Sequence, residues 1–455
     1  MSRVELLEPL FDGGVRNTNF FNGRLLAAED LRTEQESVRE RLAHVGRAAG
    51  AGVVAGLWVE KVPSGSPPGD ASHAVVSVTA GLAVSRSGQA LSLPADTEVA
   101  LVSELDPTQA EDAGLFKVCL PPTTSTVLTG AGVYVLAVTS ASGYEGKAQA
   151  SGLRDVSAGR CCGARYAVEG VRFKLVSLQI DKNPSIDAVT RARLVALTKK
   201  TDAASLSLLR NELAHACFGG ADYQDFVRDP FEVADSPAGG AGDYGALAAL
   251  RQSGALTSCD VPLALVYWSK NGIEFVDPWA VRRRVTRAAR ADRWSQVVDE
   301  RRASEGEARF RQFQDQLEAL RDAGVSVAGV RARDNFRYLP PVGFVPLGVK
   351  GEAARFAYPN FFEGLTCHRP IFIEGARVGA LVRLACTFAA HDLNPDPFDV
   401  NRPQMLWLYR VRQNRKAFDE GSAAARDYLI FTSGHVPFAG EARYDVSLWD
   451  YSNYV

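Results

Sequence analysis

The residues best suited to chemistry include a run of glycines with the spacing of a nucleotide-binding loop. Gly240-Ala241-Gly242-Asp243-Tyr244-Gly245 matches the pattern G-x-G-x-x-G, with which a backbone loop cradles a pyrophosphate. That chemistry needs a hydrophobic strand directly before the glycines, and no such strand precedes them here. A helical pattern follows over residues 246–251, and Asp260 lies at a tolerable distance for a ribose contact. Without the strand we interpret the run as a glycine-rich loop, and we predict no cofactor.

Cysteine and histidine side chains form a second group. Cys367, His368, Cys386 and His391 could supply four zinc ligands, but their spacing matches no known pattern of zinc ligands. The sequence contains seven cysteines, an odd number, and no C-x-x-C pair. We interpret the cysteines as buried and unreactive, and we predict neither a bound metal nor a disulfide.

Hydrolytic motifs are absent from the sequence. There is no G-x-S-x-G elbow, no H-E-x-x-H and no P-loop pattern. Ser433-Gly434-His435 carries no information about a catalytic triad, because a triad is an arrangement in space. We predict that the protein is not an enzyme, and a cell-wall hydrolase is the least favoured of the functions considered.

Charge and hydropathy narrow the class of protein further. The 455 residues include 51 Lys and Arg against 53 Asp and Glu, a formal charge of −2, which argues against a nucleic-acid partner. No run of about 18 apolar residues predicts a membrane-spanning segment. The first residues do not resemble a secretory signal, so we expect synthesis in a bacterial cytoplasm, with later release in an assembled particle left open. For the arginine-rich stretch over residues 282–302, a solvated helix face or an acidic partner is favoured over nucleic acid.

The elements that would position these residues predict an α+β fold. β-rich domains, built from hairpins and sandwich-like sheets, alternate with helices, and Asn271-Gly272 predicts a two-residue hairpin turn. Asp277-Pro278 predicts the start of one long polar helix over residues 277–321. Ser304-Glu305-Gly306 is the point at which such a helix would break. The expected divisions are an N-terminal motif and helix (1–50), a β-rich domain (51–184), a helical pair with a long loop and a hairpin (185–276), the long helix (277–323) and a C-terminal β-rich domain (324–455).

Two predicted helices carry apolar seams that must be buried against something. Their residues are Leu31, Val38, Leu42 and Val45 in the first helix and Phe310, Phe313, Leu317 and Leu320 in the second. We predict that the chain self-associates or docks through one of these seams. The alternative, that a seam is simply core against the chain's own sheet, is equally compatible with the pattern.

Aromatic residues near the C-terminus offer a second kind of site. Trp407, Tyr409, Trp449 and Tyr451 could line a groove that binds a glycan or a protein receptor on a cell surface. Packing in a core or an interface is the favoured explanation for these side chains.

Several blocks of the sequence, taken in their order, resemble a known family. The blocks are Asn19-Phe20-Phe21-Asn22-Gly23-Arg24-Leu25-Leu26, Asp30-Leu31-Arg32-Thr33-Glu34-Gln35, Gly52-Val53-Val54-Ala55-Gly56-Leu57, Val78-Thr79-Ala80-Gly81-Leu82-Ala83, Val261-Pro262-Leu263-Ala264 with Asp277-Pro278-Trp279-Ala280-Val281-Arg282-Arg283, and Tyr338-Leu339-Pro340-Pro341-Val342-Gly343-Phe344. Together they resemble proteins encoded beside phage-tail-like contractile injection systems. The resemblance touches most of the chain and includes no catalytic motif.

This resemblance implies a structural or attachment component of a tail-like particle. Its place could be in the baseplate, in a tail fibre or near the cap, and its partners would be other copies of itself and other subunits of the particle. A receptor- or glycan-binding module is the alternative function.

Overall fold

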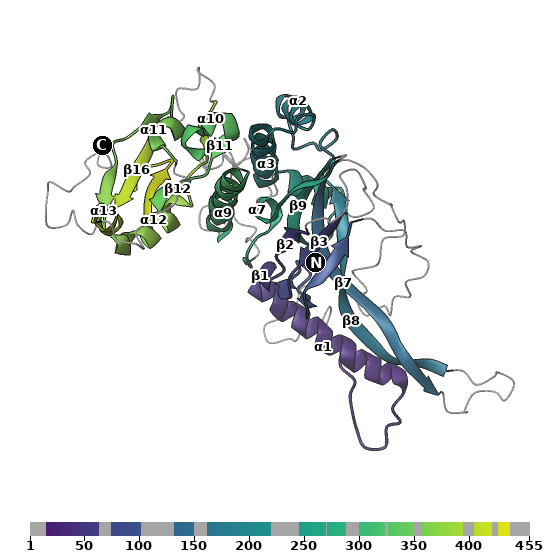
Figure 1. Ribbon diagram of the computed structural model, residues 1–455. Helices are drawn as coiled ribbons and strands as arrows, with labels where there is room; N and C mark the ends of the chain where they lie inside the picture. The colour runs from purple at the N-terminus through teal and green to yellow at the C-terminus, as the bar shows by residue number, and fades with distance from the viewer. Residues whose placement is uncertain are drawn as a thin grey trace, which may run out of the picture.

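The computed structural model describes residues 15–62, 74–101, 132–149, 162–219, 245–269, 271–287, 300–323, 326–349, 356–394, 405–420 and 426–436. These residues form an α+β fold, as the sequence predicts. Figure 1 shows two parts: an N-terminal part built on one large sheet and two small ones, and a C-terminal part around a second large sheet. Helix α9 (Glu300–Asp322) lies where the two parts meet.

The N-terminal part is organised by an antiparallel sheet with the strand order β10-β9-β7-β8. Val133 to Val138 are all buried in β7, because both faces of this sheet are covered. The strand bounds are β7 Gly132–Gln149, β8 Cys162–Ser177, β9 Val261–Ser269 and β10 Gly272–Asp277. Two three-stranded sheets cover one face: β1 (Gly52–Gly56), β4 (Gly81–Val84) and β5 (Ala90–Leu93), and β2 (Val59–Lys61), β3 (Val75–Val78) and β6 (Thr97–Ala100).

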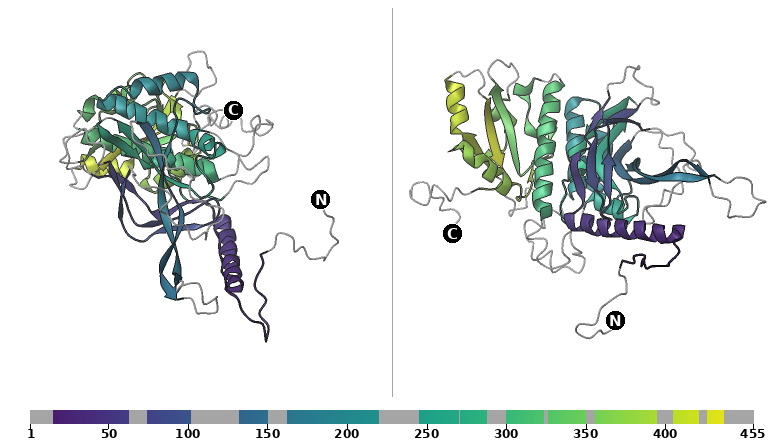
Figure 2. Two further views of the ribbon diagram at one scale, coloured as in Figure 1. Left: turned by 90° about the vertical axis from the view of Figure 1, so that its right-hand side faces the viewer. Right: turned by 90° about the horizontal axis from the view of Figure 1, so that it is seen from below.

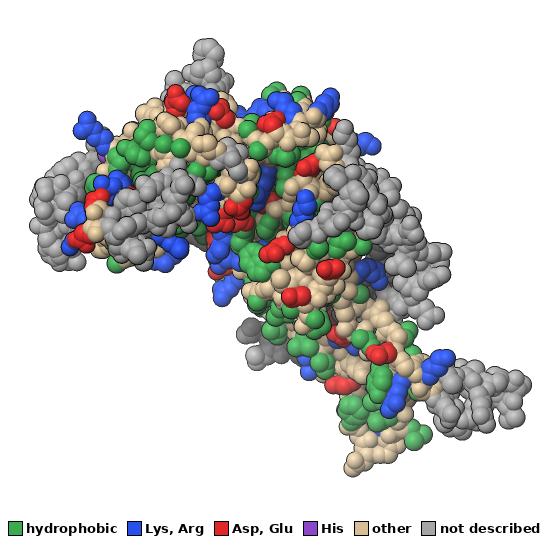
Figure 3. All heavy atoms as spheres, viewed as in Figure 1, with side chains coloured by type: hydrophobic (Ala, Val, Ile, Leu, Met, Phe, Trp, Pro, Cys, Tyr) green, Lys and Arg blue, Asp and Glu red, His purple; other side chains and the backbone are tan. Residues whose placement is uncertain are grey.

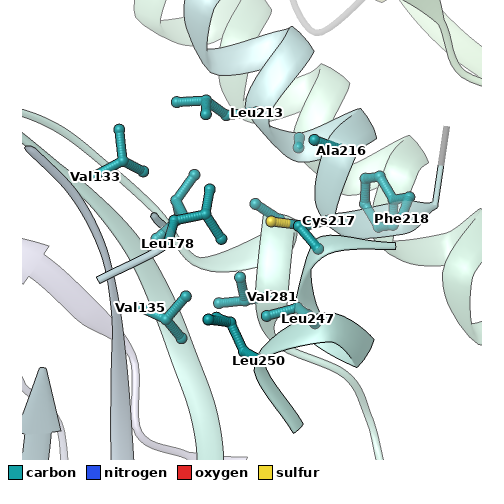
Figure 4. Close-up of a cluster of buried hydrophobic side chains, with 14 of the residues drawn as sticks. Val133, Val135, Leu178, Leu213, Ala216, Cys217, Phe218, Leu247, Leu250 and Val281 are labelled. Carbon is teal, nitrogen blue, oxygen red and sulfur yellow. The ribbon is translucent and has the colours of Figure 1, made fainter. Parts of the chain in front are cut away.

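Helices cover the other face of the same sheet. They are α2 (Ala188–Leu197), α3 (Ala203–Phe218), α6 (Ala246–Gln252) and the short α7 (Pro278–Val281). Figure 4 shows Leu213 and Cys217 of α3 packed with Leu247 and Leu250 of α6 against Val135 of β7. Asp187 and Asp202 begin α2 and α3 by accepting hydrogen bonds from backbone N–H groups in the first turn of each helix.

The C-terminal part has its own sheet, with β12 (Val342–Val349), β17 (Arg426–Thr432), β16 (Met405–Val411) and β13 (Thr366–Cys367) in that order. Strand β14 (Ile371–Ile373) also pairs with β16, in parallel. One face packs on α9, and the other on α12 (Val378–Ala385). The smaller elements are α10 (Ala332–Asn335), α11 (Tyr358–Phe361), α13 (Arg412–Asp419), the pair β11 (Tyr338–Leu339) and β15 (His391–Asp392), and the 3-10 turns Val327–Gly329 and Gly375–Arg377.

The prediction of one helix over residues 277–321 is wrong. Asp277 does cap a helix that starts at Pro278, but this helix ends at Val281 and Arg282 is extended, with φ −71° and ψ 135°. The Arg282 guanidinium donates to the carbonyl oxygen of Leu57 at 2.7 Å and also to that of Gly56, which draws the chain away from a helical path. Helix α9 then begins at Glu300. It runs without a break through Gly306, although the sequence predicts a break there. Gly306 is needed there because an added Cβ would meet the carbonyl oxygen of Cys386.

The predicted hairpin between β9 and β10 is confirmed, although its turn lies one residue earlier than expected. Gly272 pairs with Ser269, so residues 270–271 connect the strands, and residue 270 lies outside the described ranges. Gly272 has a φ of +104°, a conformation that suits glycine.

Candidate docking surface

Helix α1 (Ala28–Ala49) carries the first predicted seam, and that seam is exposed. Asp30 supports the start of the helix, because its Oδ2 accepts a hydrogen bond from the backbone N–H of Ala27 at 2.9 Å. This bond and the nearby Arg24 lower the pKa of the Asp30 carboxyl. The exposed fractions along the seam are 53% for Leu31, 46% for Val38, 62% for Leu42 and 66% for Val45.

Three contacts on two flanks hold α1 in place and leave its seam exposed. On one flank, Arg39 Nε donates to Glu169 of β8 at 2.9 Å, and Gly46 lies so close to Gly88 that a Cβ on Gly46 would meet the Gly88 carbonyl oxygen. On the other flank, Thr18 Oγ1 donates to the carbonyl oxygen of Asp30 at 2.6 Å. The apolar seam lies between these two flanks. We define Leu31, Val38, Leu42 and Val45 as the α1 seam.

A long two-stranded arm lies beside α1. Strand β9 pairs with β7 only as far as Val138, whereas β7 and β8 stay paired from Tyr134↔Ser177 to Gln149↔Cys162. Beyond β9 no strand among the described residues pairs with the ribbon, and residues 163–170 are all exposed. Figures 1 and 2 show this arm and α1 projecting from the same side of the molecule. A two-stranded ribbon is marginally stable by itself, so such an arm gains from a neighbour.

Exposed apolar side chains continue beyond the α1 seam on this projection. Leu25 and Leu26 precede the helix, and Tyr144, Tyr166 and Val168 lie on the arm. Figure 3 shows hydrophobic side chains along the surface of the projection. Exposed apolar side chains that gather on one region of a folded chain commonly mark a site of protein–protein contact. The projection is therefore the candidate docking surface.

The second predicted seam is core, so the prediction of an interface in α9 is wrong. Phe313, Leu317 and Leu320 are buried, and Phe310 is partly buried against Phe344, with ring centroids 5.1 Å apart. These side chains pack on the sheet of the C-terminal part. Periodicity alone cannot separate the two seams, because the covering sheet comes from residues more than 20 positions further along the chain.

The predicted aromatic groove is not formed by the described residues. Tyr409 is fully buried, and its hydroxyl accepts a hydrogen bond from the backbone N–H of Val436 at 3.2 Å. Trp407 is partly buried between His368 and His435, with ring centroids at 4.4 and 4.1 Å. Trp449 and Tyr451 lie outside the described residues. The prediction of a ligand-binding groove lined by Tyr409 is therefore wrong, because the Tyr409 ring is part of the core.

A buried polar interface, which the sequence did not suggest, joins the two parts of the chain. Asp277 has no exposed side-chain surface. Its Oδ2 accepts hydrogen bonds from Arg210 Nε of α3 at 2.7 Å and from Gln312 Nε2 of α9 at 3.1 Å. Its Oδ1 accepts from the backbone N–H of Ala280. One carboxylate thus binds α3, α7 and α9 together.

Amide side chains extend this interface. Asn211 Oδ1 accepts from the backbone N–H groups of Arg337 and Tyr338 at 2.9 Å each, and Asn211 Nδ2 donates to the carbonyl oxygen of Tyr338. Gln316 Nε2 donates to the carbonyl oxygen of Ser207 at 2.6 Å. In the sequence, the polar residues at these positions of α3 and α9 were the signal that could have indicated this interface, because each helix also has an apolar face.

Shifted pKa values occur at this interface without forming an acid–base pair. Burial raises the pKa of Asp315 to about 6, and burial lowers the pKa of His215 well below its ordinary value. Shifted groups gather at catalytic sites, but structural networks shift pKa values as well. His215 is stacked on Tyr338 with ring centroids 4.1 Å apart, and it serves to pack the interface.

Two arginines of the arginine-rich stretch, Arg282 and Arg283, turn inward, whereas Arg284 and Arg287 are exposed. Arg282 lies over the ring of Trp58 at 4.1 Å, and Arg283 lies over Phe218 at 4.5 Å. Arg284 pairs with Glu307 of α9 at 3.3 Å. Residues 288–299 lie outside the described ranges.

The prediction that the cysteines form no disulfide fails at one position. Cys259 is disulfide-bonded, so the prediction of no disulfide is wrong. Cys217, Cys367 and Cys386 are free thiols, and burial raises the pKa of Cys217 to about 12 and those of Cys367 and Cys386 to about 11.

Within the described part of the chain, no three His, Cys, Asp or Glu side chains are grouped so as to hold a metal ion. Residues 240–244 of the glycine run lie outside the described ranges, and α6 follows them.

No protein-family model matches this chain, and a search of curated proteins finds no match to it. Of the helices in the described ranges, none has both the length and the hydrophobicity needed to cross a bilayer.

Proposed function

We propose that this chain is a structural subunit of a phage-tail-like contractile injection particle, and that it acts by assembly and attachment rather than by catalysis. The observation that carries the proposal is the exposed α1 seam beside the β7–β8 arm. A helix with four half-exposed aliphatic side chains gains stability when a partner covers them. We name this kind of particle because the ordered sequence blocks resemble proteins encoded with such systems.

The rest of the structure supports a mechanical role. The buried contacts of Asp277, Asn211 and Gln316 join the two parts of the chain, so that a force applied to the projection would be carried to the C-terminal part. The disulfide at Cys259 agrees with a protein that functions outside the reducing cytoplasm, as a released particle does. Its position within the particle would be the baseplate, a fibre or the region near the cap.

The receptor- or glycan-binding alternative receives less support. A sugar usually stacks on an accessible aromatic face, but Trp407 already has His368 and His435 against its ring. Tyr409 cannot contribute because it is buried.

Particle purification tests the proposal. The chain would be tagged in its native host, particles would be isolated by density-gradient sedimentation, and mass spectrometry would look for the chain in fractions that contain sheath and tube subunits. We expect co-sedimentation for the wild type. Genes for sheath, tube and baseplate beside its own would agree with this, whereas a metabolic operon and absence from the particle fractions would refute the proposal.

A matched pair of variants tests whether the projection is the attachment site. Val45 in the α1 seam and Val189 in α2 are exposed to nearly the same extent, 66% and 68%. Val45→Glu should reduce incorporation into the particle, whereas Val189→Glu should leave it unchanged. Equal incorporation of both variants would count against attachment through α1.

A further inference from the structure

The α1 seam keeps the spacing of a coiled coil along the whole helix. Leu31, Val38 and Val45 are seven residues apart, and a second line runs through Ala28, Gln35, Leu42 and Ala49. The steps between successive members alternate between three and four residues from one end of α1 to the other. This is the a/d pattern of a heptad repeat, with Leu31, Val38 and Val45 at d.

The charges beside this seam are self-complementary in one orientation. Glu34 occupies a g position and Arg39 the e position five residues later, and parallel helices bring such g and e side chains of two chains together. Each pair of neighbouring helices would therefore gain contacts between Glu34 and Arg39. In an antiparallel arrangement, e positions face one another and so do g positions, so attraction between Glu34 and Arg41 would be offset by repulsion between Arg32 and Arg39. Arg39 uses Nε to reach Glu169, and a guanidinium has further N–H groups for a second carboxylate.

The surroundings of α1 leave room for this contact. The β4–β5 turn at Gly88 and the residues that precede the helix touch its flanks, whereas the seam itself is half-exposed along its length. Figure 2 shows α1 along the edge of the molecule. The 22 residues of α1 span about 33 Å, which is three heptads.

We infer that α1 helices from identical chains associate in parallel through the α1 seam. The inference rests on the proposed assembly role of this surface and names its partner, a second copy of the chain. Leu42 at an a position lies between Val38 and Val45 at d, a local arrangement that favours three or four helices over two. Gln35, a polar residue at an a position, fixes the register of the helices.

The first test is the oligomeric state of the purified full-length chain by sedimentation velocity between about 1 and 100 µM. A wild-type chain should form a concentration-dependent oligomer. Val45→Glu should weaken the association by more than about 30-fold, because a carboxylate would enter the apolar seam, and Val189→Glu should leave it unchanged. A folded wild-type chain that stays monomeric at about 100 µM overturns the inference, and so does a Val45→Glu chain that associates as the wild type does.

The second test uses charge reversal and does not depend on the apolar seam. Glu34→Arg and Arg39→Glu chains should each associate several-fold more weakly than the wild type, because like charges then face each other across every helix pair. When the two variants are mixed in equal amounts they should form mixed oligomers, and the double variant Glu34→Arg/Arg39→Glu should recover wild-type association. Failure of both the mixture and the double variant to associate, with their melting temperatures unchanged, overturns the parallel arrangement.

These outcomes separate the inference from the proposed function. A chain that is present in purified particles but is monomeric in solution, with Val45→Glu incorporated normally, refutes the homotypic contact alone. A chain that forms the predicted oligomer but is absent from particles refutes the proposed function and leaves the contact in place.

Discussion

Replacing Phe313 with alanine distinguishes a core seam from a surface seam most directly. Phe313 is fully buried, and its ring lies 5.1 Å from that of Phe336, 5.4 Å from that of Phe431 and 6.4 Å from that of Phe361, measured between centroids. Deleting it removes the burial of the ring and leaves a cavity among three aromatic neighbours. Such Phe-to-Ala substitutions cost about 3–5 kcal/mol.

Leu42→Ala in α1 is the matched control. Leu42 is 62% exposed and belongs to a seam with similar helical spacing, yet no described core cluster includes it. Substitutions at such positions change the free energy of unfolding by within about 0.5 kcal/mol. The two variants therefore differ by several kcal/mol, out of the roughly 5–15 kcal/mol that stabilises a typical protein.

Urea unfolding followed by tryptophan fluorescence and by circular dichroism measures both variants, at a chain concentration too low for self-association. With a slope of about 1–3 kcal/mol per M, Phe313→Ala should lower the midpoint of the C-terminal transition by at least about 1 M, whereas Leu42→Ala should not shift it measurably. A loss below about 1 kcal/mol for Phe313→Ala, or equal losses for the two variants, would refute the assignment of α9 to the core and α1 to the surface.

Three further substitutions test the buried interface between the two parts and the contact of α1 with the β4–β5 turn. Asp277→Asn should lower the free energy of unfolding by about 3–5 kcal/mol, seen by thermal denaturation, because it removes the carboxylate that is hydrogen-bonded to the buried Arg210 guanidinium. His215→Phe should move the midpoint of acid unfolding to lower pH. His215 has a depressed pKa when folded and an ordinary one near 6.5 when unfolded, so its contribution to stability is lost as pH falls below about 6.5. Gly46→Val should raise the protease sensitivity of α1, because the new side chain would overlap the Gly88 backbone.

Each of these outcomes can fail in a recognisable way. An Asp277→Asn chain that melts like the wild type would show that the carboxylate does not hold α3 and α9 together. An unchanged acid midpoint for His215→Phe would mean that His215 does not stay neutral in the folded chain. Normal protease resistance of Gly46→Val would contradict the close contact of α1 with the β4–β5 turn.

Local signals in the sequence predict much of the secondary structure correctly. The apolar period of α1, the strong turn signal at Asn271-Gly272 and the cap at Asp277 all depend on residues within a few positions of one another. Interactions of this range are already set by the covalent chain, because side-chain spacing and backbone preferences act before any tertiary contact forms. The same reasoning predicts the α+β class and the apolar period of the α1 seam, but not its exposure.

Contacts between distant residues decide what local patterns leave open. Arg282 leaves the helix because the carbonyl oxygens of Gly56 and Leu57, more than 200 residues earlier, accept its N–H groups. The α9 seam is core because the sheet that contains Phe431 covers it, whereas no described sheet covers the α1 seam. Both seams meet the same periodic criterion, and burial depends on what the rest of the chain brings to them. Only the folded chain therefore shows which seam remains available to a partner.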